Sequence, residues 1–177
     1  MERLLDPSAL GDHVDRLYRA AWGLCGSRED AEDLVQETYA RILAKPRTIR
    51  GDDDIGYLLR ALRNQFYSQH RRASHRPRTE PLPEDREFVD PRAGLRPDEA
   101  VAAREVFARI ADLTPDFRDV LVAVDVAGLS YAETATLVGA KEATVTSRLF
   151  RARAQVARAL GSGMEPGTEG VPTERRP

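Results

Sequence analysis

The side chains of this sequence best suited to a specific task are arginines and small hydroxyls spaced along one segment near the C-terminus. At about 100° per residue, a helix from about Lys141 to Leu160 gathers its apolar residues within one narrow arc. These inward residues are Val145, Leu149, Ala152, Val156 and Leu160. The opposite side carries Thr144, Ser147, Arg151, Gln155 and Arg158, with Phe150 at the border. Small hydroxyls let a helix approach a DNA groove, and arginines reach bases or phosphates. A solvated helix face has the same pattern.

A helix-turn-helix pattern precedes this face. Ser130 and Glu133 form a capping box that opens a short helix, and Gly139 ends it before the longer helix begins. Two helices joined by a short glycine-containing turn are typical of DNA-binding helix-turn-helix proteins. The segment from Gly128 to Leu160 therefore predicts binding of duplex DNA through its second helix.

A second candidate segment, from Arg60 to Arg72, contains no acidic residue and interleaves cations with an amide and an aromatic ring. Its candidate residues are Arg60, Arg63, Asn64, Tyr67, Arg71 and Arg72. Binding of single-stranded DNA needs cations for the backbone and flat rings for unstacked bases. The alternative is a basic helix end that complements its own dipole.

A third candidate segment, from Ser27 to Glu37, is acidic and begins a helix that is predicted to run to about Leu43. Its apolar side is formed by Ala31, Leu34, Val35, Thr38 and Ile42, and its outward side by Asp33, Gln36, Glu37 and Ala40. An acidic face repels DNA and therefore suits a protein partner. A face that only provides solubility is the alternative.

Helices position all three segments, so the sequence predicts an all-α fold. Helix signals begin at Asp6-Pro7, at Ser27 and at Asp52 to Asp54, and again at Thr114-Pro115. We expect two small helical domains, 1–72 and 99–160. The proline-rich, highly charged segment 73–98 between them is predicted to be a flexible linker, and 161–177 a disordered tail. No β pattern is evident.

Composition excludes several classes of function. The 177 residues carry a net charge of −2 and a single cysteine, Cys25, which cannot form an internal disulfide. No apolar run approaches the roughly 20 residues that span a bilayer, and no signal peptide is evident, so we expect a cytoplasmic protein.

No nucleophile is paired with a base and no glycine-rich phosphate loop occurs. His70, His75 and Cys25 are too scattered for a zinc site. The sequence therefore predicts no enzyme, no catalytic residue, no metal and no cofactor.

Taken together, the three segments resemble the extracytoplasmic-function (ECF) branch, group IV, of the sigma-70 family of RNA polymerase sigma factors. The resemblance is carried by DAEDLVQETYARIL from Asp30 to Leu43 and YLLRALRN from Tyr57 to Asn64. It continues in GLSYAETATLVG and ATVTSRLFRARAQV, which lie between Gly128 and Val156. The likeness covers most of the chain outside the expected linker and tail.

For the N-terminal domain, the resemblance implies binding to the β′ clamp helices of core RNA polymerase. The implied contacts are Asp30, Asp33, Leu34, Gln36 and Glu37. It also implies that the −10 promoter element is read and opened as single-stranded DNA, by Arg60, Arg63, Asn64, Tyr67, Ser68, Arg71 and Arg72 and the loop Lys45 to Asp54. Ser68 stands where the family usually has aspartate.

For the C-terminal domain, the resemblance implies contact with the polymerase β flap and reading of the −35 element in the major groove. The implied contacts are Ser130, Thr144, Thr146, Ser147, Arg148, Phe150 and Arg151, with Ser130 and nearby amides on phosphate. Thr146 stands where a basic residue is frequent and Val124 where many members have arginine, so the promoter preference is expected to differ. An anti-sigma factor is the further partner implied.

The sequence thus predicts an alternative sigma factor that brings core polymerase to particular promoters. The alternative is a helix-turn-helix regulator that binds duplex DNA without polymerase. Such a regulator has no need of the acidic helix, which therefore distinguishes the two hypotheses.

Overall fold

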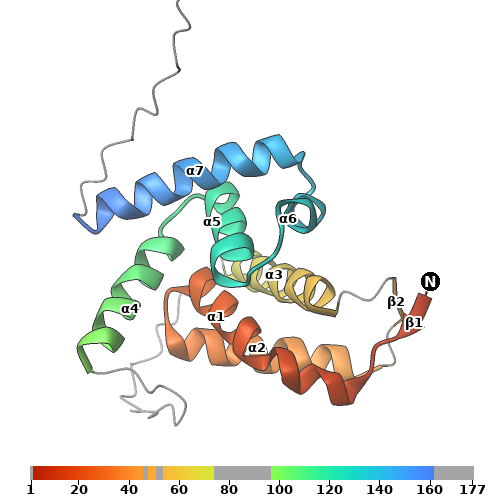
Figure 1. Ribbon diagram of the computed structural model, residues 1–177. Helices are drawn as coiled ribbons and strands as arrows, with labels where there is room; N and C mark the ends of the chain where they lie inside the picture. The colour runs from red at the N-terminus through yellow and green to blue at the C-terminus, as the bar shows by residue number, and fades with distance from the viewer. Residues whose placement is uncertain (1, 46–47, 51–53, 74–96, 162–177) are drawn as a thin grey trace, which may run out of the picture.

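The computed structural model describes residues 2–45, 48–50, 54–73 and 97–161, and these residues are almost entirely helical (Figure 1). The helices of the N-terminal half are the 3₁₀ helix η1 (Pro7–His13), α1 (Val14–Cys25), α2 (Arg28–Leu43) and α3 (Asp54–Ala73). Those of the C-terminal half are α4 (Pro97–Ala111), α5 (Pro115–Leu121), the π-helix η2 (Val122–Val126), α6 (Tyr131–Val138) and α7 (Glu142–Ala159). The predicted all-α fold is confirmed.

Helices α1, α2 and α3 pack on one another and form the N-terminal unit. Helix α2 begins where the Ser27 side chain accepts a hydrogen bond from the Asp30 backbone N–H, as the capping pattern predicts. The whole predicted apolar side of α2 is buried. In α3, Leu58, Leu62 and Phe66 are buried as expected. Gly26, in the left-handed region, ends α1 and turns the chain into α2.

A short strand pair departs from the prediction that no β structure is present. Strands β1 (Glu2–Leu4) and β2 (Thr48–Arg50) pair in antiparallel register, with Arg3 opposite Ile49. Three-residue strands are too short to show the alternation of polar and apolar residues that identifies a strand in sequence. Arg3 also forms an ion pair with Asp54, so the strand pair is tied to the start of α3.

In the C-terminal unit, a helix starts at Thr114-Pro115 as predicted, although no side-chain hydrogen bond caps it. This helix, α5, continues directly into the π-helix η2, and Gly128 follows with φ of 72°. The predicted capping box of α6 is confirmed, because the Ser130 hydroxyl accepts from the Glu133 N–H and the Glu133 carboxylate accepts from the Ser130 N–H. Gly139 ends α6 in the left-handed conformation, which only glycine adopts readily.

The two units pack against each other and share one hydrophobic core. The Trp22 ring of α1 stacks on the Phe107 ring of α4, with 4.2 Å between centroids and 14° between planes. Gly23, one residue further along α1, faces Val122 of η2 so closely that a Cβ atom would lie 2.8 Å from its methyl group. Figure 1 shows α1 beside α4 and α5, with α7 on the far side of α5.

Two predicted segments lie largely outside the described residues. These are the linker 73–98, of which 74–96 are not described, and the tail 161–177, of which only Gly161 is described. Within the described part of the chain, no helix is both long and apolar enough to cross a membrane.

We expect Ser130→Ala to lower the free energy of unfolding by about 1 kcal/mol, because it removes the N-cap of α6. Hydrogen bonds from the Ser130 hydroxyl and backbone N–H lower the pKa of the Glu133 carboxyl. The part of the stabilisation that depends on this carboxylate is therefore complete above the ordinary glutamate pKa and is lost as the pH falls through the lowered pKa. Urea denaturation between neutral and acid pH measures both effects.

Ser147→Ala is the matched control, because the Ser147 hydroxyl is exposed and donates only to the Thr144 carbonyl. Its expected effect is within about 0.5 kcal/mol. An equal loss in both variants would contradict the capping role.

Candidate functional site

The outer face of α7 carries the exposed side chains expected of a recognition helix. Thr146, Ser147, Phe150 and Arg151 are exposed, and Phe150 retains 66 % of its accessible surface. Both hydroxyls are oriented by their own helix, because Thr146 donates to the Glu142 carbonyl and Ser147 to the Thr144 carbonyl, each at 3.0 Å. Each hydroxyl oxygen keeps acceptor capacity toward a ligand. The inward residues Val145, Leu149 and Ala152 are buried as predicted.

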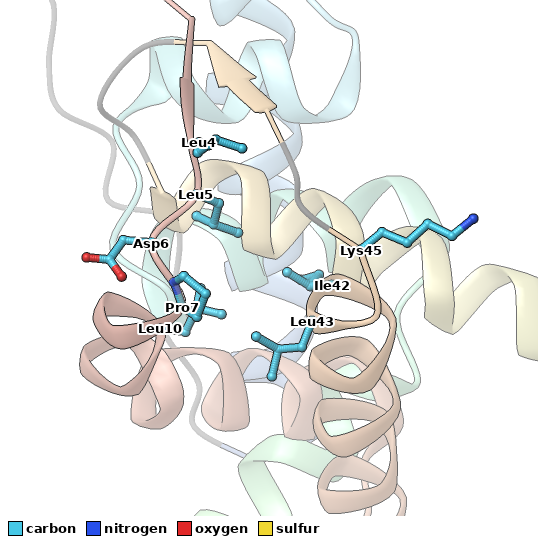
Figure 2. Close-up of a pocket in the computed structure, with 8 residues that line it drawn as sticks. All are labelled: Leu4, Leu5, Asp6, Pro7, Leu10, Ile42, Leu43 and Lys45. Atoms are coloured by element: carbon cyan, nitrogen blue, oxygen red, sulfur yellow. The ribbon is translucent and has the colours of Figure 1, made fainter.

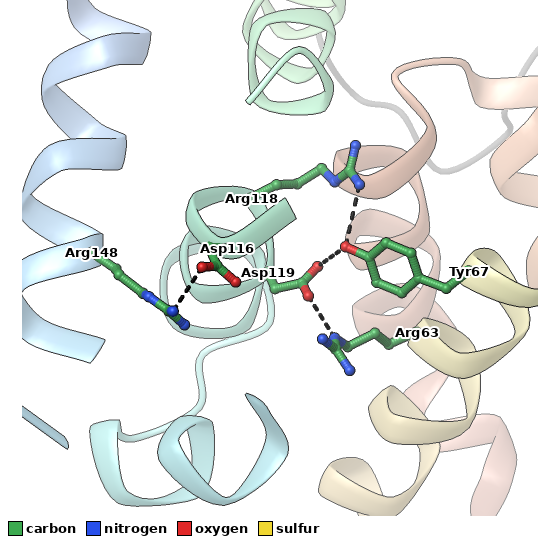
Figure 3. Close-up of polar contacts among 6 residues, drawn as sticks. All are labelled: Arg63, Tyr67, Asp116, Arg118, Asp119 and Arg148. Carbon is green, nitrogen blue, oxygen red and sulfur yellow. Dashed lines mark hydrogen bonds and ion pairs between the residues drawn. The ribbon is translucent and has the colours of Figure 1, made fainter. Parts of the chain in front are cut away.

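Two ion pairs fix α7 against the preceding helices. The Arg148 guanidinium lies 2.7 Å from an Asp116 carboxylate oxygen on α5 (Figure 3). The Arg153 guanidinium donates to both carboxylate oxygens of Asp125, at 2.7 and 2.9 Å. Arg148, predicted to contact the −35 element, is therefore half-buried and engaged by α5, and Thr144 of the same predicted set is also half-buried.

The donors of Ser130 are also engaged. Both its backbone N–H and its hydroxyl reach the Glu133 carboxylate. A phosphate would have to compete with this carboxylate for the same donors. Ser130 itself is exposed at the start of α6, where a helix N-terminus favours an anion.

The residues of α3 that were predicted to contact the −10 element differ in their exposure to solvent. Arg60, Asn64, Arg71 and Arg72 are exposed. Arg63, Tyr67 and Ser68 are only partly exposed. Of the loop Lys45 to Asp54, residues 46–47 and 51–53 lie outside the described part of the chain.

Arg63 and Tyr67 are held by Asp119, a residue that the sequence analysis did not single out (Figure 3). The Arg63 Nε lies 2.6 Å from the Asp119 Oδ2, and the Tyr67 hydroxyl donates to the Asp119 Oδ1 at 2.8 Å. Burial raises the pKa of the Tyr67 phenol. Asp119 is only 5 % exposed. An acid directly before the apolar stretch from Val120 to Val124 was the signal available in the sequence.

Arg118 completes this cluster. Its guanidinium donates to the Tyr67 hydroxyl at 3.3 Å and lies 4.9 Å from the centre of the Phe66 ring. Arg63 lies over the Tyr67 ring and Arg118 over the Phe66 ring. A cation placed over an aromatic ring is attracted to it electrostatically. Three side chains of α3, Arg63, Phe66 and Tyr67, thus meet the adjacent Arg118 and Asp119 of α5 at the boundary between the two units.

The acidic face of α2 is largely as predicted. Asp30, Asp33 and Gln36 are exposed, whereas Glu37 is half-buried and its carboxylate accepts from the Gln69 amide at 2.6 Å. Leu34, included in the predicted polymerase contacts, is 1 % exposed because it belongs to the apolar side of the same helix. Leu34 therefore packs in the core beneath the acidic face of α2 and is not part of that face.

An apolar groove lies between the N-terminal segment and the end of α2 (Figure 2). Its lining residues are Leu4, Leu5, Asp6, Pro7, Leu10, Ile42, Leu43 and Lys45. The exposed side chains Leu4 and Leu43 stand on opposite walls. The groove contains no arrangement of nucleophile and base.

The residues that the structure describes were also compared with the requirements of a metal site and of a reactive thiol. No group of three or more His, Cys, Asp or Glu side chains there is arranged to hold a metal ion. Cys25 is partly buried, and desolvation raises the pKa of its thiol to about 12. A thiol with so high a pKa is a poor nucleophile.

Comparison with known proteins supports the interpretation of both units. The family model for sigma-70 region 2 matches residues 10–76, and that for sigma-70 region 4 matches residues 103–156. The ECF RNA polymerase sigma factor SigM of Mycobacterium tuberculosis is 34 % identical over 150 residues, which cover 84 % of this chain and 74 % of the relative. The chain belongs to the ECF RNA polymerase sigma factors.

A second relative is the ECF sigma factor SigE of Mycolicibacterium smegmatis, 37 % identical over 147 residues. The match covers 81 % of this chain but 57 % of that relative, so the chain spans little more than half of its length. The fold is similar to that of the sigma factor RpoE in its complex with the anti-sigma factor NepR from Bartonella quintana. The TM-score is 0.63 with 23 % identity, and the match covers 88 % of this chain and 96 % of the other.

We expect Leu34→Ala to destabilise the fold by about 2–5 kcal/mol, because it removes a buried side chain from the N-terminal core. Gln36→Ala, two residues along the same helix but exposed, is expected to change stability by less than about 0.5 kcal/mol. Urea denaturation followed by circular dichroism compares the two. Equal free energies of unfolding for the Leu34 and Gln36 variants would contradict the buried position of Leu34.

Proposed function

We propose that this ECF sigma factor binds core RNA polymerase through α2 and directs it to promoters through α3 and α7. The observation that carries the proposal is the segregation of the two kinds of surface. Exposed Asp33 and Gln36 lie on α2, while the exposed arginines Arg60, Arg71, Arg72 and Arg151 lie on the separate helices α3 and α7. Carboxylates that repel DNA suit a protein partner, and arginines suit phosphates and bases.

For core polymerase, the proposed surface is Asp30, Asp33 and Gln36, with Glu37 at its edge. The partner proposed is the β′ clamp helices, and the β flap is proposed for the C-terminal unit. The Gln69 amide holds the Glu37 carboxylate in place, and this makes Glu37 a fixed rather than a freely rotating acceptor. Leu34 is buried beneath this surface and anchors α2 to the core.

For the −10 element, the proposed contacts are the exposed Arg60, Asn64, Arg71 and Arg72, together with Arg63, Tyr67 and Ser68. The mixture of cations, an amide and a phenol ring fits single-stranded DNA, whose phosphates need charge and whose unstacked bases need flat partners. Stacking on such a ring is worth about 1–3 kcal/mol per base.

For the −35 element, the proposed contact face of α7 is Thr146, Ser147, Phe150 and Arg151. The exposed Phe150 offers an apolar surface suited to a thymine methyl group, and Arg151 offers the fork that suits guanine. We assign Arg148 mainly to bracing α7, since Asp116 already engages its guanidinium. Thr144, half-buried on α7, and Ser130, exposed at the start of α6, complete the proposed contact set.

The protein is proposed to work in the cytoplasm, where core polymerase and promoter DNA are found, and to act by binding rather than by catalysis. An anti-sigma factor is proposed as its regulator, since the similar fold of RpoE has been solved in a complex with the anti-sigma factor NepR. The alternative regulator without polymerase is not favoured by the relatives, which are named as RNA polymerase sigma factors.

The decisive experiment is run-off transcription on fragmented genomic DNA with purified bacterial core polymerase, with and without this protein. Defined start sites are expected only when the protein is present. Identical transcripts in both reactions would refute the sigma-factor proposal.

We expect Asp33→Ala combined with Gln36→Ala to weaken binding to core polymerase by at least about tenfold, because both side chains lie on the proposed contact face. Both are exposed, so the fold should be unaffected. Glu105→Ala, which removes an exposed acid from α4, is the control and should bind normally. Native gel or fluorescence anisotropy titration with labelled protein measures the affinity, and equal affinities for all variants would exclude the α2 face.

We expect Arg151→Ala to weaken binding of the holoenzyme to a promoter found by run-off transcription, by about 1–3 kcal/mol if the guanidinium contacts a base. Arg104→Ala removes an exposed arginine from α4 and is the control. Footprinting of the −35 region gives the affinity of each. A full-strength footprint with the Arg151 variant would remove this residue from the contact face.

A further inference from the structure

The segment before α1 holds the part of the chain that leads into α3. Strand β1 pairs with β2 in antiparallel register, with Arg3 opposite Ile49 (Figure 1). The Arg3 guanidinium also pairs with the carboxylate of Asp54, the first residue of α3. Strand β2 lies within the loop Lys45 to Asp54, which is among the −10 contacts expected from the family. Strand β1 and its arginine therefore contact this loop at β2 and at its last residue.

The segment that carries β1 is anchored in the core of the N-terminal unit. Leu5 and Leu10 are buried, and the Tyr39 hydroxyl of α2 donates to the Leu10 carbonyl at 2.9 Å. On the partner strand, Ile49 is buried in the same cluster of apolar residues. A pair of strands is only marginally stable by itself. These anchors therefore give two three-residue strands the support that their own pairing does not supply.

The ion pair of Arg3 and Asp54 sets the position of the strand pair relative to α3. The Asp54 side chain is 12 % exposed and that of Arg3 is 33 % exposed, so the carboxylate is largely shielded from water. Fully exposed ion pairs contribute little, whereas a shielded, charge-assisted hydrogen bond is stronger. The pair joins β1 to the helix that carries Arg60 and Asn64, which follow Asp54 within about three turns.

We propose that β1 is a positioning element for promoter recognition, and that Arg3 is its positioning residue. By holding β2 against the start of α3, β1 orders this part of the chain before DNA arrives, so that less conformational entropy is lost on binding. The inference rests on the proposed reading of the −10 element by α3. It adds that a strand outside the proposed DNA contacts determines how strongly the −10 sequence is preferred.

Strand β1 also lies outside the part of the chain that resembles region 2. That match begins at residue 10, whereas β1 ends at Leu4. The matched part therefore contains β2 and Asp54 but neither the strand nor the arginine that pairs with them. The support of the loop is thus a feature that the matched part of the chain does not contain.

The test compares variants of the full chain at the two ends of the ion pair. Arg3→Ala removes the guanidinium and Asp54→Asn removes the carboxylate charge, whereas Arg3→Lys keeps a cation. The double variant, Arg3→Ala with Asp54→Asn, tests whether the two residues act as one unit. Arg19→Ala is the matched control, because it removes an exposed arginine of α1 that donates to the Asp15 carbonyl of the same helix.

Two quantities are measured on each protein. Hydrogen exchange followed by NMR gives the protection of the backbone amides of β2 in the free chain. Fluorescence anisotropy with the holoenzyme gives affinities for two single-stranded oligonucleotides. One carries the −10 sequence of a promoter found by run-off transcription, and the other carries the same bases in scrambled order. The ratio of the two affinities is the −10 preference, which a loss of folded protein leaves unchanged.

Arg3→Ala and Asp54→Asn are each expected to speed exchange in β2. They are expected to lower the −10 preference by about fivefold, since a loop ordered for about a fifth of the time loses that factor in apparent affinity. The scrambled strand, bound through its phosphates, should be affected little. Arg3→Lys is expected to retain most of the preference and Arg19→Ala all of it. The double variant is expected to lose no more than either single variant.

Unchanged exchange in β2, or faster exchange with an unchanged −10 preference, would overturn the positioning role. An equal loss of affinity for both oligonucleotides would also overturn it. Losses that add in the double variant would do the same, because Arg3 would then act independently of Asp54. Run-off transcription with the parent chain separates these results from failure of the proposed function, because defined start sites can persist while the role of β1 is refuted.

Discussion

The close approach of helix α1 to the C-terminal unit is the constraint on which the rest of the structure depends. Gly23 removes the side chain that would keep α1 and η2 apart, and Trp22 then reaches Phe107 and stacks on it. Without this approach the two small units would each have a separate core. With it, the buried residues form one continuous cluster, which matters because small helical units bury little apolar surface alone.

Carboxylates of α5 and η2 form ion pairs with arginines of α3 and α7. Asp116 engages Arg148 of α7, Asp125 engages Arg153 of α7, and Asp119 engages Arg63 of α3. The first two pairs set the orientation of the recognition helix within its own unit. The third joins the units, and it does so at residues that also suit single-stranded DNA. A short helical segment thus both positions one proposed DNA-binding surface and covers part of another.

The local features of the fold follow from the sequence because they depend on neighbouring residues. The capping box of Ser130 and Glu133, the left-handed Gly139 and the buried side of α2 all appear where the pattern predicts them. Such signals act over one or two helical turns. The strand pair escaped prediction because its two three-residue strands are too short to carry a pattern. Leu34 was assigned to a surface although the periodicity of its own helix directs it inward.

By itself, the sequence determined the helical fold, the limits of most helices, the separation of acidic and basic faces, and the family. These properties arise from residue type and spacing within single helices. Only the tertiary structure decided which of the proposed contact residues are accessible. Asp119 lies more than fifty residues from Arg63 and Tyr67 along the chain, and its pairing with them depends on how two units meet rather than on any local pattern. A buried carboxylate needs partners, and which partners it finds is set by packing across that boundary.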